Sequence, residues 1–329
     1  MANINDVAKL AGVSRGTVSN VINNKKVKES SRIKVEKAIE ELGYVPNVAA
    51  RDLKKKVSSL VVFILPTIWN PFFSELAYHL QLELKKYGLK LLLCNSMDNY
   101  KFEIEYIKMA QEHKVLGIIS VTYSDILPFL QSDISYVSIK HYYTEDIPCV
   151  TTDNVMGGMI AAKELVKRGC KNLLHITRGV KNDPGLNDLK KGFENYCKKN
   201  KIKYFVYDEV STSDTFSSLV YDFISNSIKK GEVYDGIFCG TDHYVDYCMD
   251  DALKGNNLKV PEDVQIIGFI GEKSHANESF KISTIQTPIK ELAVTSVNML
   301  LDSVKGILEK KLVLLPVKFS EGETTKKIT

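Results

Sequence analysis

The chain has 329 residues, 44% of them hydrophobic and 26% charged, with a mean hydropathy of −0.12, which is the composition of a globular protein. No apolar run is long enough to cross a membrane, and the N-terminus lacks the charged-then-apolar pattern of a secretion signal, so we expect a cytoplasmic protein without a membrane partner. The six cysteines form no Cys-x-x-Cys pair, and the six histidines have no ligand spacing. The sequence therefore indicates no disulfide framework, no metal site and no cofactor.

The net charge of +4 is unevenly distributed along the chain. Residues 1–56 contain 12 Lys and Arg against 6 Asp and Glu, a net of +6, so residues 57–329 carry −2. A basic excess confined to a small N-terminal segment is the electrostatic pattern expected of contact with nucleic acid phosphates.

Residues 3–23 have the pattern of two short helices separated by one glycine turn. Asn3 can cap the first helix, Gly12 ends it in a left-handed turn, and Ser14 can cap the second. A third helix is predicted near residues 35–42, ending before Gly43. The inward apolar positions of the first two helices are Ile4, Val7, Ala8, Ala11, Val18, Val21 and Ile22, and the outward positions of the second are Arg15, Gly16, Ser19 and Asn20. A three-helix bundle without a ligand would fit the same pattern, but the charge distribution favours a helix-turn-helix domain that binds DNA.

Several short motifs make this segment similar to a known family. Ile4-Asn-Asp-Val-Ala, Gly12-Val-Ser, Thr17-Val-Ser, Val21-Ile-Asn and the run from Glu40 to Leu53 resemble the opening of the LacI/GalR family of bacterial transcription regulators. The resemblance implies that the second helix reads bases, with Arg15, Gly16 and Asn20 at the base-reading positions. Arginine suits guanine and asparagine suits adenine, whereas Gly16 has no side chain to read with. The residues better interpreted as phosphate-positioning groups are Asn3, Ser14, Thr17, Asn23 and Tyr44.

Residues 46–57 are expected to connect the small domain to the rest of the chain. A solvated basic linker is one interpretation, since so short a segment cannot hold a helix alone in water. The resemblance implies instead a hinge helix that pairs across a dimer and enters the minor groove. Leu53 stands at the position of the family's minor-groove wedge, and Arg51 and residues 54–56 would hold phosphates.

Residues 58–329 alternate between strand-like and helix-like segments. Apolar strands between amphipathic helices predict parallel sheets covered on both faces, here two doubly wound lobes joined to the all-α helix-turn-helix domain. We thus expect three parts: residues 1–45, the hinge 46–57, and the core 58–329. The expected strands are 59–65, 89–94, 115–121, 173–177, 204–207, 236–240, 264–268 and 312–319, and the expected helices are 72–87, 101–112, 154–168, 186–199, 216–228, 244–253 and 288–308.

The core also carries marks of the same family, including Asn70-Pro-Phe-Phe, Gly192-Phe, Gly240-Thr-Asp and Gly268-Phe. The resemblance implies a core like that of periplasmic sugar-binding proteins, with two lobes that close on a small effector. Ligands of such sheets bind at the carboxyl ends of the strands, so the turns 66–73, 153–154, 177–185, 240–242 and 268–273 are informative.

The usual polar groups of such an effector pocket are missing at three places in this chain. Leu189 stands where the family has an arginine, Ile270 and Gly271 replace an aspartate pair, and Thr287 replaces a glutamine. The remaining candidates are Phe72 and Phe73 as stacking faces, and Asp153 and Asp242 as acceptors. Core packing is an equal interpretation for the two phenylalanines, and helix capping for the two aspartates.

The sequence predicts a homodimeric transcription regulator, by default a repressor, that binds a pseudo-palindromic operator in double-stranded DNA. A sugar-like or other small metabolite would modulate it. The alternative is a regulator with a degenerate pocket, constitutive or controlled by a protein partner. An enzyme is disfavoured, because the sequence has no phosphate-binding loop, dinucleotide fingerprint, zinc-protease or serine-hydrolase motif.

Overall fold

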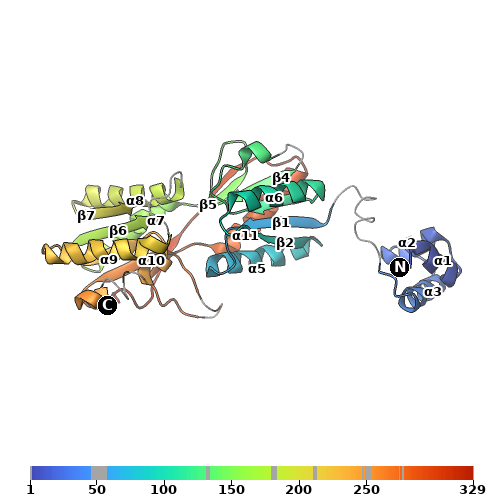
Figure 1. Ribbon diagram of the computed structural model, residues 1–329, viewed down its shortest axis with the longest axis horizontal. Helices are drawn as coiled ribbons and strands as arrows, with labels where there is room; N and C mark the ends of the chain where they lie inside the picture. The colour runs from blue at the N-terminus through green and yellow to red at the C-terminus, as the bar shows by residue number, and fades with distance from the viewer. Residues whose placement is uncertain are drawn as a thin grey trace. The chain divides into compact units, whose positions relative to one another are not determined.

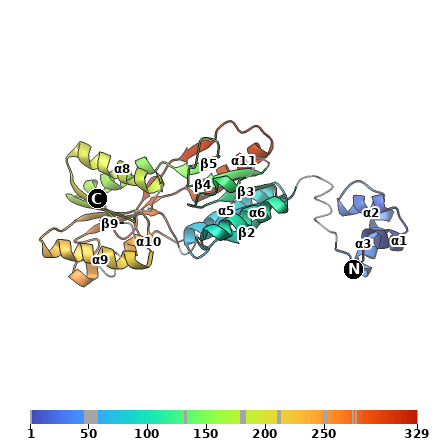
Figure 2. The ribbon, with the colours of Figure 1, turned by 45° about the horizontal axis from the view of Figure 1, so that its top comes forward.

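The computed structural model describes residues 2–45, 58–130, 134–178, 184–209, 213–246, 248, 253–273, 275 and 278–328. The chain divides into two compact units, Met1–Ser58 and Ser59–Thr329 (Figures 1 and 2). The predicted hinge, residues 46–57, lies outside the described residues.

The described part of the first unit, residues 2–45, contains three helices. Its helices are α1 (Ile4–Ala11), α2 (Arg15–Ile22) and α3 (Glu29–Glu41). Helices this short are stable only when they share a core, and the three of them bury one set of small apolar side chains. That set is Val7, Ala8, Ala11, Val18, Val21, Val35 and Ala38.

The second unit begins with a six-stranded parallel sheet, the first lobe, in the order β11-β5-β4-β3-β1-β2. Strand β1 shows why its sequence is continuously apolar: Val61 and Phe63 face one cluster, while Val62 and Ile64 face another. Helices α5 (Pro71–Lys86) and α11 (Ile289–Val304) cover the first face, and α6 (Tyr100–Glu112) covers the second. The strands are β1 (Leu60–Leu65), β2 (Lys90–Asn95), β3 (Gly117–Ser120), β4 (Ser135–Ile139), β5 (Cys149–Thr152) and β11 (Leu312–Leu315), with a 3-10 turn at Leu127–Phe129.

The second lobe is a six-stranded sheet in the order β12-β10-β9-β8-β6-β7, parallel except for β12. Figure 1 shows α8 (Pro184–Asn200) and α9 (Ser213–Lys229) on opposite sides of this sheet, with α7 (Asn154–Lys167) on the side of α8. The strands are β6 (Asn172–Arg178), β7 (Lys203–Glu209), β8 (Gly236–Cys239), β9 (Gln265–Ile270), β10 (Thr284–Gln286) and β12 (Lys318–Ser320); short α10 (His243–Asp246) and a 3-10 turn at Lys254–Asn256 complete it. The predicted fold class, a helical domain joined to two doubly wound lobes, is confirmed.

One detail of the prediction is corrected. The predicted strand 312–319 is two strands, β11 in the first sheet and β12 in the second. Pro316 stands between them, and a proline has no N–H to donate to a ladder, so the chain leaves one sheet there and enters the other. Helix α7 packs within the second lobe, and α11 returns to the first. The predicted helix 244–253 is described in part: α10 covers its start and Cys248 and Leu253 have helical backbone, while residues 247 and 249–252 lie outside the described residues.

Among the described residues, no helix has the length and apolarity that a membrane span requires. All six cysteines are buried and unpaired, and burial raises the pKa of the Cys94 thiol to about 11. The Cys94 thiol is therefore held in its neutral form inside the first lobe.

Candidate nucleic-acid interface and ligand cavity

The helix pair of the first unit is held by the caps that its sequence predicts. Asn3 Oδ1 accepts hydrogen bonds from the backbone N–H of Asn5 (2.8 Å) and Asp6 (3.4 Å), and Asp6 Oδ2 returns one from the N–H of Asn3 (2.8 Å). Gly12 ends α1 in the left-handed region, at φ 62°. Ser14 Oγ accepts from the N–H of Thr17 at 3.1 Å and so starts α2. These local bonds fix the angle at which α2 leaves the turn.

The outer face of α2 is polar. Arg15 and Gly16 are exposed, Asn20 is half-buried, and Val18 and Val21 face the core. Within residues 2–45, no carboxylate forms an ion pair with Arg15, so its guanidinium is available to a partner. This places the two base-reading candidates, Arg15 and Asn20, on one helix, outside the packed core.

The side chains predicted to contact DNA phosphates differ in their hydrogen-bond partners and exposure. Thr17 Oγ1 lies 3.0 Å from Ser14 Oγ, and Asn23 donates its amide N–H to the carbonyl of Ser19 at 2.6 Å. Tyr44 packs against the helical core while part of it stays accessible. Because the oxygen of Asn3 is used in capping, a donor role toward phosphate would fall to its Nδ2.

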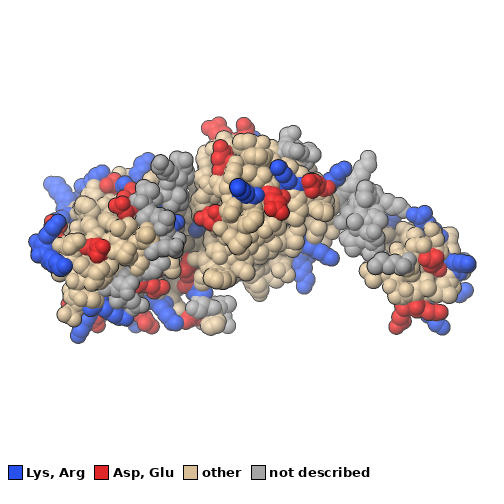
Figure 3. All heavy atoms as spheres, viewed as in Figure 1, with Lys and Arg blue, Asp and Glu red and all other residues tan. Residues whose placement is uncertain are grey.

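The basic excess of this region is shared between the described helices and the segment after them. Residues 2–45 contain eight Lys and Arg against five Asp and Glu, a net of +3, and residues 46–56 supply the other +3. In the space-filling view, basic side chains lie around the visible rim of the first unit, and most of its visible acidic side chains lie at the lower edge (Figure 3). Arg51 and Leu53, the phosphate and wedge candidates, lie outside the described residues.

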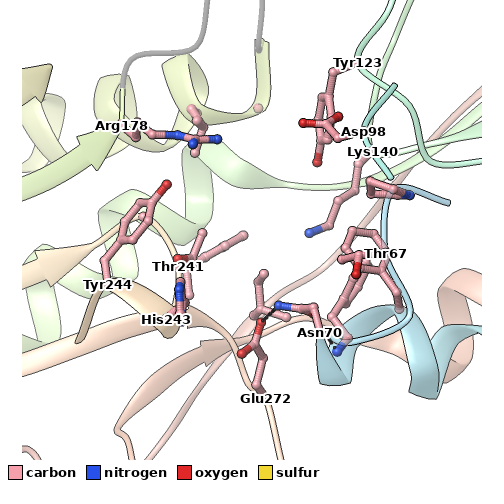
Figure 4. A pocket seen from close by; sticks show the side chains of 18 of the residues that line it. Thr67, Asn70, Asp98, Tyr123, Lys140, Arg178, Thr241, His243, Tyr244 and Glu272 are labelled. Carbon is pink, nitrogen blue, oxygen red and sulfur yellow. Dashed lines mark hydrogen bonds between the residues drawn. The ribbon is translucent and has the colours of Figure 1, made fainter. Parts of the chain in front are cut away.

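The second unit contains a cavity of about 750 Å³ at the carboxyl ends of the strands of both lobes (Figure 4). Its walls come from the turns after β1, β2, β3, β4 and β5 and from those around β6, β8 and β9. This is where doubly wound sheets bind ligands. The lining residues are Pro66, Thr67, Ile68, Trp69, Asn70, Phe72, Phe73, Asn95, Met97, Asp98, Tyr123, Lys140, Thr152, Asn154, Arg178, Gly185, Leu186, Leu189, Gly240, Thr241, His243, Tyr244, Phe269, Ile270 and Glu272.

Aromatic side chains form much of this wall. Phe72 and Phe73 stand edge to face, with ring centroids 5.1 Å apart. Phe72 is only 1% exposed, whereas Trp69 is 92% exposed at the edge of the cavity. Phe72 and Phe73 each pack against the core of the lobe and also line the cavity, so core packing is observed and the stacking role stays a prediction.

A hydrogen bond joins the lobes across the cavity. Asn70 caps α5 by accepting from the N–H of Phe72 at 2.9 Å, and its Nδ2 donates to Glu272 Oε1 at 2.8 Å. Asn70 belongs to the first lobe and Glu272 to the second, so this bond ties the two walls together (Figure 4).

Two buried polar atoms in the wall have no hydrogen-bond partner among the described residues: Arg178 Nε and Thr241 Oγ1. Arg178 ends β6, and Thr241 follows β8, the next strand of the same sheet. A buried donor without a partner is costly, typically about 1–3 kcal/mol, and is expected where a ligand supplies the missing bond.

Asp153 and Asp242 do not line the cavity. Asp153 Oδ1 accepts from the N–H of Met156 at 2.9 Å and caps α7. Asp242, 3% exposed, accepts from the N–H groups of Gly271 and Glu272, each at 2.7 Å. Burial raises the pKa of Asp242 to about 7, against these hydrogen bonds, which favour the ionised form. Its observed task is to hold the loop that carries Glu272.

The sequence did not identify the polar residues of the cavity one by one, but it did predict most of the turns in which they lie. Asn70, Arg178, Thr241 and Glu272 all lie within the turns after strands that were singled out as informative. Lys140 follows β4, a strand that the sequence did not predict, so no sequence signal led to it. Of the places where the usual polar groups are missing, Leu189 and Ile270 line the cavity, and Gly271 and Thr287 do not.

Comparisons with known proteins agree with this geometry. Residues 3–47 match the model of bacterial regulatory proteins of the lacI family, and residues 162–325 match that of a periplasmic binding protein-like domain. The chain is 34% identical to the sucrose operon repressor of Streptococcus mutans, over 98% of this chain and 99% of that one, and 32% identical to the ribose operon repressor of Bacillus subtilis, over 99% of each.

Solved structures show the same fold. A lac repressor dimer bound to operator and an anti-inducer superposes with a TM-score of 0.84 at 21% identity, covering 98% of this chain and 99% of that one. A regulator from Alkaliphilus metalliredigens, complexed with D-xylulofuranose, gives a TM-score of 0.70 at 27% identity, over 82% of this chain and all of that one.

Proposed function

Because the chain belongs to the LacI family of bacterial regulatory proteins, we propose that it represses an operon by binding a pseudo-palindromic operator as a homodimer. The full-length similarity to sucrose and ribose operon repressors supports this function, and it sets the enzyme alternative aside. A repressor of this kind works on chromosomal DNA and therefore in the cytoplasm.

The observation that carries the proposal is the outer face of α2. Its exposed Arg15 can give a bidentate bond to guanine, and Asn20 can do the same to adenine. Phosphate contacts then fall to the residues that surround this helix and continue into the hinge, and Leu53 would wedge into the minor groove. The proposed phosphate contacts are Asn3, Ser14, Thr17, Asn23, Tyr44 and Arg51.

A small sugar-like effector is the proposed ligand of the cavity. Relatives are named for the sucrose and ribose operons, and a solved neighbour holds D-xylulofuranose. Phe72 and Phe73 offer ring faces, and Asn70 and Glu272 offer hydrogen-bonding groups for hydroxyls. Since a ligand between the lobes would contact both, it would bias their relative position and so the operator affinity.

The alternative of a degenerate pocket under constitutive or protein-partner control rests on Leu189 and Ile270, which replace expected polar groups. It predicts operator binding that no small molecule changes. The open volume and the polar atoms without partners favour the effector.

Selection of bound sequences from a random DNA pool tests the DNA-binding function, and repeating it with a metabolite panel tests the cavity. We expect a two-fold-symmetric site.

Replacing Arg15 with alanine should weaken operator binding by about 1–3 kcal/mol and relax the base preference at one base pair in each half-site. The control Lys37→Ala removes one exposed charge from α3 and should leave the preference unchanged. Equal loss on all sequences would make Arg15 a phosphate contact, and a monomer on operator DNA in sedimentation would refute the dimer.

A further inference from the structure

We propose that the effector is a sugar-sized polyol carrying an oxyanion, a phosphate ester or a carboxylate, held between Arg178 of the second lobe and Lys140 of the first. This inference rests on the proposed effector function of the cavity and specifies the chemical class of the ligand.

The first argument is the state of Arg178. It stands at the last position of β6, lines the cavity, and points into it from the second lobe in Figure 4. Its Nε is buried and has no hydrogen-bond partner among the described residues. A guanidinium keeps its charge in proteins, so this N–H remains a donor that no described group of the wall satisfies. Its planar fork matches a carboxylate or phosphate.

The cavity wall has an apolar side chain, Leu189, as well as the positively charged Arg178. An arginine from helix α8 would be expected at residue 189, but the chain has an apolar side chain there, in the same cavity wall. Arg178 supplies a charge from the end of the neighbouring strand instead. The wall therefore carries a cation at the end of β6 although residue 189 is apolar.

Thr241 adds a second donor beside the same sheet. Its Oγ1 is buried in the wall without a partner among the described residues, and it follows β8, which pairs directly with β6. A hydroxyl can donate to one oxygen of an oxyanion while the guanidinium binds the others. Two unsatisfied donors on adjacent strand ends fit one group rich in acceptors.

Lys140, in the first lobe, supplies a second positive charge for an anionic ligand. It follows β4 with a left-handed backbone, φ 68°, which is uncommon for a residue with a side chain. Its Nζ lies 3.9 Å from the centroid of the Phe72 ring, and Figure 4 shows the side chain reaching into the cavity from the side opposite Arg178. An anion that bound both cations would connect the two lobes.

The carboxylates of the cavity restrict where that anion can sit. Glu272 is hydrogen-bonded to Asn70, and Asp98 is exposed at the end of β2. Carboxylates repel an oxyanion but accept bonds from hydroxyls, so they suit the polyol part of the ligand. The ligand is therefore expected to be polar at both ends but charged at one.

Fluorescence of Trp69, the only tryptophan, reports on binding because this residue lines the cavity edge. The probes are two pairs, ribose 5-phosphate with ribose and glucuronate with glucose, so that the phosphate and carboxylate arms are separate. In the wild-type chain, at least one charged probe should bind about tenfold or more tightly than its neutral partner. Arg178→Gln and Lys140→Gln should each remove that preference.

Lys203→Gln is the matched control, since it removes one exposed charge at the amino end of β7, whereas Arg178 lies at the carboxyl end of the adjacent β6. It should retain the preference. The proposal is overturned if neutral probes bind the wild-type chain as tightly as charged ones. It is also overturned if every charged probe, inorganic phosphate included, changes the fluorescence and the unfolding temperature of Arg178→Gln as much as those of the wild-type chain. Operator selection on the same preparations separates the two claims: release of operator by a neutral sugar would keep the proposed function and refute only the charge.

Discussion

Replacing Asp242 with alanine should destabilise the second unit by about 2–5 kcal/mol, because the carboxylate holds the loop after β9 from inside the lobe. Its Oδ2 accepts from the N–H groups of Gly271 and Glu272, each at 2.7 Å, and its Oδ1 accepts from the Thr284 hydroxyl at 2.8 Å. Alanine leaves two backbone donors without an acceptor, at about 1–3 kcal/mol each. The Glu272 amide is only partly buried, so water can offset part of its loss.

Urea denaturation followed by circular dichroism measures this cost, and hydrogen exchange at the amides of Gly271 and Glu272 locates it. Thr284→Val is the control, because it removes one donor and leaves both backbone bonds; its cost should be about 1 kcal/mol. If Asp242→Ala changed the free energy of unfolding by less than about 0.5 kcal/mol, or if both amides kept their protection, the loop would not depend on this carboxylate.

Three further outcomes are expected. Burial raises the pKa of Asp242 to about 7, above the 3.8 of the free side chain, so between these pH values the folded protein keeps a proton that the unfolded chain releases. The unfolding free energy of the wild-type chain, relative to that of Asp242→Asn, should therefore fall as pH rises from about 4 to 7, by up to about 1.4 kcal/mol per pH unit. A difference that does not change with pH would refute this. Gly16→Ala should stabilise α2 by up to about 1 kcal/mol, since a Cβ there meets only Ser14 Oγ at 3.6 Å, and should leave the selected DNA sequence unchanged. Gly158→Ala would place a Cβ 2.0 Å from the Leu189 carbonyl oxygen, so thermal unfolding should show a loss of about 3 kcal/mol; a wild-type melting temperature would contradict this packing.

The sequence predicted best what short stretches of chain determine by themselves. The caps Asn3, Gly12 and Ser14 act within a few residues, and their hydrogen bonds are as expected. The long amphipathic helices and the apolar strands of both lobes were also predicted, because burial on two faces leaves a continuous apolar run that is visible without the fold. Strands β4, β5 and β10 were missed, since Ser, Thr and Gln interrupt their apolar residues and leave no continuous apolar run.

Tertiary structure decided how distant segments combine. No local pattern shows that α11 and β11 return to the first lobe, because that depends on which sheet has an open edge for them. Asp242 is the clearest case: sequence left it as a ligand or a cap, and packing makes it the acceptor for a loop 29 residues later. The sequence by itself thus determined a DNA-binding helix pair on a two-lobed core. Only the fold placed Arg178 opposite Lys140, because the carboxyl ends of strands from two separate sheets meet at one cavity.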